Sequence, residues 1–333
     1  MTMTKLVRFT REDSIHAALG VIPAFCLIAF GKIAVGSAFA IGLLPTSLMG
    51  IAASRRLRLI YGLVGCLFGI GVFLGSLIIN RNDTLVAAAL FIVIAFVATI
   101  LAVKRPAGGL LLSLLVPALG VGTGYAVAKA AGLMLAFVAG SIWSCLVMLP
   151  WPEFAPDPNL NARLMGLQPR HAKKYGLLLG LTAATAIIVG HQFHVPYPGW
   201  IATAALLIIR PLQGMTGWRG VGRAATTIAG TALVIVVIGL ELGSWATAVC
   251  VSLITIMTIG ARSSRLYVTP FGTAFLILTI ELYGSTDAAG IRQVGMYRIV
   301  NNVYGALIAL FYGLLVSWLL ERLSASRSGN AAT

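Results

Sequence analysis

Long apolar runs follow one another along almost the whole chain, and this pattern is the strongest constraint on its fold. A helix needs roughly 20 apolar residues to cross a bilayer core of about 30 Å, and twelve runs in the 333-residue sequence approach that length. Only 10% of the residues are charged and 59% are hydrophobic, whereas about a quarter are charged in a soluble domain. The sequence therefore excludes a soluble globule. The predicted spans are residues 14–33, 35–53, 59–79, 84–103, 107–128, 132–151, 175–193, 195–209, 224–242, 245–261, 266–282 and 295–320.

The charge distribution indicates how these spans are oriented. The chain carries 24 Lys and Arg against 9 Asp and Glu, a net charge of +15, which fits either a nucleic-acid surface or the cytoplasmic loops of a membrane protein. With the N-terminus in the cytoplasm, alternation of the spans places 19 of the 24 basic residues inside. These residues are spread through short loops, so we expect no nucleic-acid partner. The bias predicts that both termini are cytoplasmic.

A polar interruption divides the spans into six and six. An offset of 165 residues brings three pairs of identical residues into register: Arg58 with Arg223, Gly65 with Gly230, and Gly140 with Gly305. Because six is even, both halves begin on the same side of the membrane. We therefore predict an all-α integral membrane protein with about twelve transmembrane helices in two parallel six-helix repeats. The expected units are residues 1–151 (first repeat), 152–174 (cytoplasmic linker), 175–320 (second repeat) and 321–333 (cytoplasmic tail).

The last predicted span carries polar residues on one helical face. Arg298, Asn301 and Asn302 share this face with the small residue Gly305, because their spacing follows the helical period. Such a face avoids lipid, and it serves either close helix packing or a hydrated pathway. Thr226 and Thr227 repeat the pattern with Gly230 in the span that follows Arg223.

One span is shorter than the others. Residues 195–209 would rise only about 22 Å as a helix, which places Arg210 near the edge of the hydrocarbon core. Pro211 follows directly, and Pro45 lies at the matching depth of the first half. Short or proline-interrupted spans at corresponding positions of two repeats indicate a binding site. A cytoplasmic anchor is the alternative role for Arg210.

The sequence lacks a catalytic constellation, so we expect neither an enzyme nor a bound metal or cofactor. Two carboxylates near the outer ends of spans, Glu281 and Asp287, are candidates for coupling transport to protons. An ion pair with Arg298 is the alternative role for Glu281. Aromatic residues near span ends are expected to form an interfacial belt; they are Tyr197, Trp200, Trp218 and Trp245.

Residues 197–203 (YPGWIAT), Arg210 with Pro211, and residues 218–223 (WRGVGR) resemble the fusaric acid resistance family of aromatic acid exporters. Residues 292–320 resemble the closing helix of the same domain. The resemblance implies a bacterial inner-membrane protein that moves organic, often aromatic, carboxylates out of the cytoplasm. It is a resemblance to a short form, without the soluble cytoplasmic domain of longer members. Four arginines carry over as cationic residues of the domain: Arg210, Arg219, Arg223 and Arg298.

These observations lead to one transport hypothesis. The carboxylate is received by a group near the cytoplasmic side, namely Arg210, Arg223, Thr226 and Thr227. Arg298, Asn301 and Asn302 form the outer constriction, because guanidinium and amide groups hydrogen-bond carboxylates. The expected partners are a small organic anion and the lipid bilayer, with a periplasmic adaptor or a homo-oligomer as the protein partner.

Two other functional classes stay open. A drug exporter of the major-facilitator type shares the six-plus-six topology, but its loop between spans two and three is expected to contain an acidic residue. Residues 54–58 (SRRLR) contain none. The other class is a non-transporting accessory subunit of the membrane.

Overall fold

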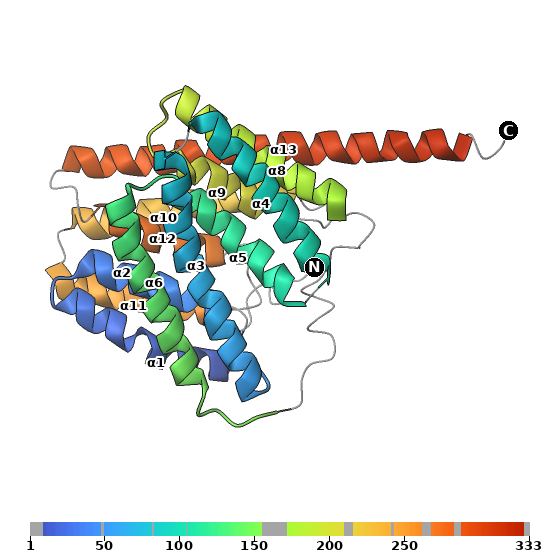
Figure 1. Ribbon diagram of the computed structural model, residues 1–333. Helices are drawn as coiled ribbons and strands as arrows, with labels where there is room; N and C mark the ends of the chain where they lie inside the picture. The colour runs from blue at the N-terminus through green and yellow to red at the C-terminus, as the bar shows by residue number, and fades with distance from the viewer. Residues whose placement is uncertain are drawn as a thin grey trace.

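The computed structural model describes residues 9–47, 50–81, 83–104, 106–154, 172–209, 216–240, 243–261, 268–282 and 288–329 (Figure 1). Within these ranges the chain is helical and contains no strand. The helices are α1 (Arg11–Ala29), α2 (Ile33–Ser47), α3 (Arg55–Arg81), α4 (Thr84–Lys104), α5 (Pro106–Gly122), α6 (Val127–Met148), α8 (Ala172–Gln192), α9 (Gly199–Ile208), α10 (Thr216–Gly239), α11 (Gly243–Gly260), α12 (Val268–Leu282) and α13 (Ala288–Gly329).

Each of these helices corresponds to one predicted span, although several bounds differ. Seven described helices, namely α1, α3, α4, α6, α8, α11 and α13, are long and apolar enough to cross a membrane. The last helix, α13, begins earlier and ends later than its predicted span. The prediction of an all-helical membrane protein is therefore confirmed for the described residues.

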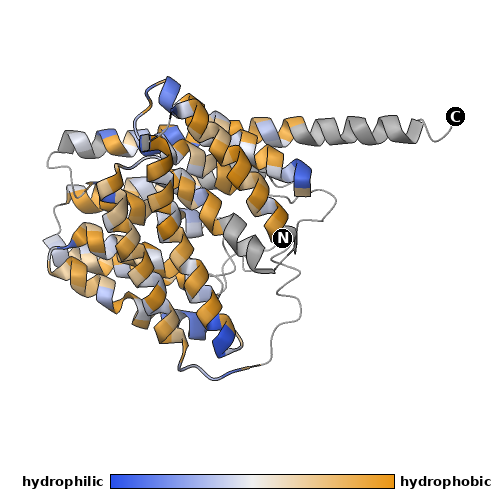
Figure 2. Cartoon of the chain, viewed as in Figure 1, coloured by the Kyte–Doolittle hydropathy of each residue, from blue (hydrophilic) through white to orange (hydrophobic). Residues whose placement is uncertain are grey.

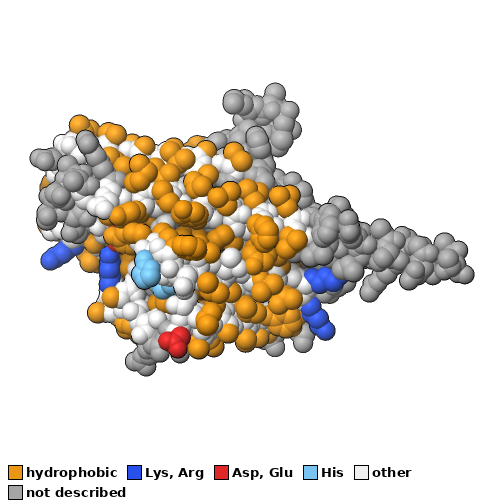
Figure 3. Space-filling model, turned by 90° about the horizontal axis from the view of Figure 1, so that it is seen from above, with side chains coloured by type: hydrophobic (Ala, Val, Ile, Leu, Met, Phe, Trp, Pro, Cys, Tyr) orange, Lys and Arg blue, Asp and Glu red, His pale blue; other side chains and the backbone are white. Residues whose placement is uncertain are grey.

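The outer surface of the bundle suits lipid. Hydrophobic residues run along the helices, whereas hydrophilic residues gather near helix ends (Figure 2). Seen from above, apolar side chains cover much of the surface (Figure 3). Large side chains such as Leu63, Leu85 and Leu135 are 71%, 71% and 66% exposed. A water-soluble monomer rarely exposes apolar patches of this extent, whereas a bilayer favours them.

Two short helices, α2 and α9, lie inside the bundle. Every described residue of α2 from Gly36 onward is buried, as are residues 199–206 of α9. The ten residues of α9 rise about 15 Å, half the thickness of a hydrocarbon core. The predicted shortness of this span is confirmed, and the helix is shorter still because the preceding residues are not helical. Tyr197 has φ 55°, and α9 begins only at Gly199.

Glycine permits this late start. A Cβ atom at Gly199 would lie 2.5 Å from the carbonyl oxygen of Gly120 and 2.6 Å from the backbone nitrogen of Gly124. Both atoms belong to the C-terminal end of α5 and the turn after it. A side chain at residue 199 would therefore force α9 away from α5.

The two halves of the chain use corresponding neighbours. In the first half α2 packs against α6, and α3 packs against α5 and α6; in the second half α9 packs against α13, and α10 packs against α12 and α13. Contacts between the halves also correspond. The first helix of each half packs against the fourth helix of the other half, in the pairs α1–α11 and α8–α4. The second helix of each half packs against the fifth helix of the other half, in the pairs α2–α12 and α9–α5. The matched glycines lie at these contacts. A Cβ at Gly140 would meet the Phe39 carbonyl oxygen of α2, and one at Gly305 the Ile201 carbonyl oxygen of α9.

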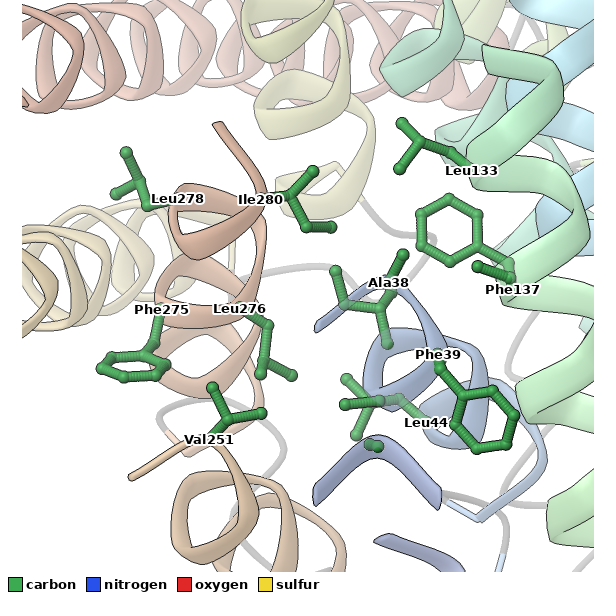
Figure 4. Packing of buried hydrophobic residues seen from close by; sticks show 14 of the residues in the cluster. Ala38, Phe39, Leu44, Leu133, Phe137, Val251, Phe275, Leu276, Leu278 and Ile280 are labelled. Carbon is green, nitrogen blue, oxygen red and sulfur yellow. The ribbon is translucent and has the colours of Figure 1, made fainter. Parts of the chain in front are cut away.

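An apolar core joins the halves. Figure 4 shows Phe39 and Leu44 of α2 facing Phe137 of α6 on one side, and Leu276 and Ile280 of α12 on the other. In lipid, such contacts stabilise the bundle through close van der Waals packing, because apolar burial gives little driving force there. The short helices therefore sit in a tightly packed interior that helices of both halves enclose.

Candidate functional site

The polar face predicted for the last span is buried. Arg298, Asn301 and Asn302 are 3%, 0% and 4% exposed, and they lie on α13, which packs against α9 and α10. Gly305 lies on the same face, against α9. The spacing of these residues thus predicts their common orientation correctly.

A group of aromatic rings lies on one side of the Arg298 guanidinium. The Arg298 Cζ atom lies 4.6 Å from the centroid of the Trp200 ring, within the range of a cation–π interaction. The Tyr197 ring stacks on Trp200 with centroids 4.5 Å apart and planes 10° apart. The Tyr297 ring lies 6.5 Å from Tyr197. We call Arg298, Trp200, Tyr197 and Tyr297 the arginine–aromatic group.

Asn301 fixes the loop that carries Tyr197. Its side-chain nitrogen donates hydrogen bonds to the carbonyl oxygens of Pro196 and Tyr197, at 2.6 Å and 3.2 Å. The Asn302 side chain instead donates to the Arg298 carbonyl oxygen, 2.8 Å away on its own helix. The two asparagines therefore act on the backbone, Asn301 holding the start of α9 against α13.

An ion pair lies beside this group. The Lys129 ammonium of α6 is 2.8 Å from a carboxylate oxygen of Glu281 at the end of α12. The Glu281 side chain is 2% exposed and the Lys129 side chain 46%. Glu281 thus pairs with Lys129, although its charge also acts on Arg298. Among the described residues, Arg298 has no carboxylate within ion-pair distance.

Three buried polar atoms of this region lack a hydrogen-bond partner among the described residues: Arg298 Nε, Glu281 Oε1 and Asn301 Oδ1. A buried polar atom without a partner costs about 1–3 kcal/mol, so such a concentration indicates a place where a ligand or water binds. Tyr125, in the turn before α6, adds a donor. Burial and the Glu281 carboxylate raise the pKa of Tyr125 well above that of free tyrosine, so its hydroxyl stays protonated.

The site draws on both halves of the chain. Tyr125 and Lys129 come from the first half, whereas Trp200, Glu281 and Arg298 come from the second. Two cations and one carboxylate give the region a net positive charge. A buried guanidinium next to aromatic faces can bind the carboxylate of an aromatic acid through its donors and the acid's ring through stacking.

Two other predicted site residues, Thr226 and Thr227, belong to α10, which packs against α13. Thr226 and Thr227 are about halfway along α10, where Thr227 is 2% exposed and the Thr226 hydroxyl donates to the Gly222 carbonyl oxygen at 2.8 Å. The backbone of Arg223 belongs to α10, but its side chain lies outside the described part, as do Arg210 and Asp287. The structure therefore brings Arg298, Asn301 and Glu281 together.

Sequence reasoning missed three members of the site. The sequence predicts Lys129 to be one of the basic residues on the outer side of the membrane, and no sequence motif marks Tyr125 as a site residue. Trp200 was expected in an interfacial belt, but it is 2% exposed, so that expectation is wrong for this residue. Trp245 is 66% exposed and fits the belt. The YPGW motif of residues 197–200 was the available signal for Trp200.

Comparison with known proteins gives a family similarity for the segment that carries most of this site. No curated protein and no solved structure matches the chain significantly. The family model described as fusaric acid resistance protein-like matches residues 184–312, a range that contains Trp200, Glu281, Arg298 and Asn301. Residues 184–312 of this multi-pass membrane protein are therefore similar to the fusaric acid resistance protein-like family, as the motifs around Tyr197 and Arg298 predict.

Proposed function

We propose that the chain is an exporter of organic carboxylates, aromatic acids in particular, in the bacterial inner membrane, with both termini in the cytoplasm. The fusaric acid resistance-like domain supports a membrane transporter and not an enzyme. The observation that carries the substrate class is the buried Arg298 guanidinium, which stacks on Trp200 and has no carboxylate partner among the described residues.

The transport path lies between two parallel six-helix repeats in this proposal. The corresponding helix neighbours of the two halves support the repeats. The short, buried helices α2 and α9 occupy matching places, and interrupted or short helices at the interface of repeats are typical substrate-binding elements of transporters. The path would pass beside α9, because its ten residues end well before a full crossing.

The residues of the path have separate roles. Arg210, Arg223, Thr226 and Thr227 receive the carboxylate from the cytoplasm. At the outer constriction the carboxylate binds the Arg298 guanidinium while the acid's ring stacks in the arginine–aromatic group. Asn301 and Asn302 hold the backbone of that constriction. Glu281 and Asp287 are the proposed coupling carboxylates, since Glu281 competes with the substrate for Lys129 and Arg298.

The test uses purified protein in liposomes and radiolabelled hydroxybenzoate. A hydrogen bond to a charged group contributes about 1.5–3 kcal/mol, so we expect Arg298→Gln to lower kcat/KM by about 10- to 150-fold. Arg56→Gln is the control, because Arg56 is an exposed cation on α3. Equal hydroxybenzoate transport by Arg298→Gln and the unmodified protein would overturn the site assignment.

Substrate selectivity provides a second readout. Trp200→Leu keeps an apolar side chain but removes the ring that faces the Arg298 guanidinium. Aromatic stacking is worth about 0.5–1.5 kcal/mol, so the preference for benzoate over cyclohexanecarboxylate should fall by about 2- to 10-fold. An unchanged preference would contradict the proposed role of the aromatic group.

A further inference from the structure

A second buried polar cluster lies at the opposite end of the bundle from Arg298. Asp13 and His16 of α1, Ser47 of α2 and Ser144 of α6 are 3%, 1%, 1% and 0% exposed. The charge distribution places this end of the three helices at the cytoplasmic side. We call these four residues the cytoplasmic histidine cluster.

Hydrogen bonds define the protonation of the His16 ring. His16 Nε2 lies 3.1 Å from the Ser144 carbonyl oxygen. A carbonyl oxygen only accepts hydrogen bonds, so Nε2 carries a hydrogen and donates it. The Ser144 hydroxyl lies 3.4 Å from the same nitrogen and 2.8 Å from the Ser47 hydroxyl.

The other nitrogen of the ring is an unused base. In a neutral imidazole with hydrogen on Nε2, Nδ1 carries a lone pair. This atom is buried and has no hydrogen-bond partner in the described part of the chain. The large majority of buried polar atoms are hydrogen-bonded, and a histidine that takes up a proton needs one nitrogen with a free lone pair.

Burial of the His16 ring opposes a charge there, whereas one nearby carboxylate favours it. The Asp13 carboxylate lies one turn earlier on α1 and acts on the ring; it accepts hydrogen bonds from the Thr10 hydroxyl and the Ile51 backbone. Of the helices that pack against α1, α2 and α11 contain no charged residue. On α6 the charged residue is Lys129, at the far end, and the titratable thiols of these two helices are Cys145 on α6 and Cys250 on α11.

One further cation is near, but it is engaged. Arg58 of α3 is fully buried, and its guanidinium donates to the carbonyl oxygens of Met148, Trp151 and Pro152 at and beyond the end of α6. On α1 itself Arg11 and Glu12 are exposed to solvent, so the buried Asp13 is the described charge that acts on an imidazolium at residue 16.

The fold itself does not require these polar residues. In the 165-residue register, Leu178 and Leu181 of α8 stand at the places of Asp13 and His16, and Ala309 of α13 at the place of Ser144. Leu178 and Ala309 are buried, at 9% and 0% exposure. Apolar residues thus fill the corresponding positions of the second half.

We propose that His16 is the group through which the transporter exchanges its coupled proton with the cytoplasm. This inference rests on the proposed function and adds the inner end of the proton pathway to it. A proton adds to the Nδ1 lone pair and the ring becomes an imidazolium opposite Asp13. Its release to cytoplasmic water restores the neutral ring, and one proton enters the cell as the organic anion leaves.

His16→Gln tests this role in liposomes. The glutamine amide can still donate to the Ser144 carbonyl oxygen, but it cannot take up a proton. We expect hydroxybenzoate exchange at equal pH on both sides to stay within about twofold of the unmodified protein. Accumulation driven by a pH gradient should fall at least about tenfold. His191→Gln is the matched control. His191 lies at the C-terminal end of α8, and its Nδ1 atom is engaged, 3.0 Å from the Ile187 carbonyl oxygen.

The outcomes separate this inference from the proposed function. If His16→Gln retains accumulation driven by the pH gradient, His16 is not the exchange group. If the unmodified protein moves no organic anion at all, the proposed function fails first. A direct readout then still applies, namely NMR of ¹⁵N-histidine-labelled protein. As the pH is lowered from about 8 to about 4, one solvent-protected histidine ring must gain a proton at Nδ1 while Nε2 keeps its proton. A ring that stays neutral throughout would overturn the inference.

Discussion

The ion pair between Lys129 and Glu281 should respond unequally to removal of its two partners. Removing one partner of a buried ion pair costs about 3–5 kcal/mol. Lys129→Gln leaves the Glu281 carboxylate, 2% exposed, without its cation. Because the Arg298 charge still acts on Glu281, we expect a loss of about 2–3 kcal/mol in the free energy of unfolding. Glu281→Gln leaves Lys129, 46% exposed, which water can solvate, and Arg298, which keeps its contact with the Trp200 ring, so the loss should be smaller, about 1–2 kcal/mol.

The assay is equilibrium unfolding of the purified protein in mixed micelles with increasing dodecyl sulfate. The double variant Lys129→Gln/Glu281→Gln removes both charges and should recover most of the loss seen in Lys129→Gln. Lys173→Gln is the control, since Lys173 is exposed on α8. A larger loss for Glu281→Gln than for Lys129→Gln would refute the reasoning from burial. The affinity for hydroxybenzoate provides a second test. It should increase in Glu281→Gln, because the site gains positive charge, and decrease in Lys129→Gln, because the site loses positive charge.

Two further predictions concern packing and helix ends. Gly140→Ala should lower the free energy of unfolding by about 1–3 kcal/mol, because the new Cβ would lie 2.2 Å from the Phe39 carbonyl oxygen. Gly132→Ala, on the same helix, is the control. Its Cβ would meet no atom within 4 Å, so it should be neutral or stabilising in the same unfolding assay. Arg58→Lys and Arg58→Gln should each cost about 3 kcal/mol or more, because one amine or amide cannot donate to all the carbonyl oxygens of Met148, Trp151 and Pro152 that the guanidinium binds. The folded fraction of either Arg58 variant should keep its substrate selectivity in liposomes, and a changed selectivity would place Arg58 in the pathway.

The sequence predicts the helices well because their signals are local. Apolar runs locate each described helix, and the helical period places Arg298 and Asn301 on one face. The site depends on contacts that no local pattern encodes. Lys129 and Glu281 are 152 residues apart, and only the packing of the two halves brings them within 2.8 Å. The prediction for Trp200 is wrong for a related reason. Aromatic residues near span ends usually face the membrane interface, but other helices enclose α9, so its first turn is buried.

The position of the polar site within the two halves gives a reason to regard it as functional. In the 165-residue register, four polar residues of the site around Arg298 correspond to apolar residues of the first half: Arg298 to Leu133, Asn301 to Ala136, Asn302 to Phe137 and Glu281 to Val116. Those four apolar residues are 7%, 8%, 3% and 0% exposed, and Figure 4 shows Leu133 and Phe137 in the packed core.

The same helix positions can therefore be filled by apolar side chains that pack well. An arginine within a membrane span costs about 3 kcal/mol on insertion scales, and the unpartnered Arg298 Nε and Glu281 Oε1 atoms add to that cost. Packing alone would favour a leucine at residue 298, as it does at residue 133. Charged and titratable residues remain around Arg298 in the second half and around His16 in the first half. In the proposed function, these two places supply the anion site and the proton exchange site of one path.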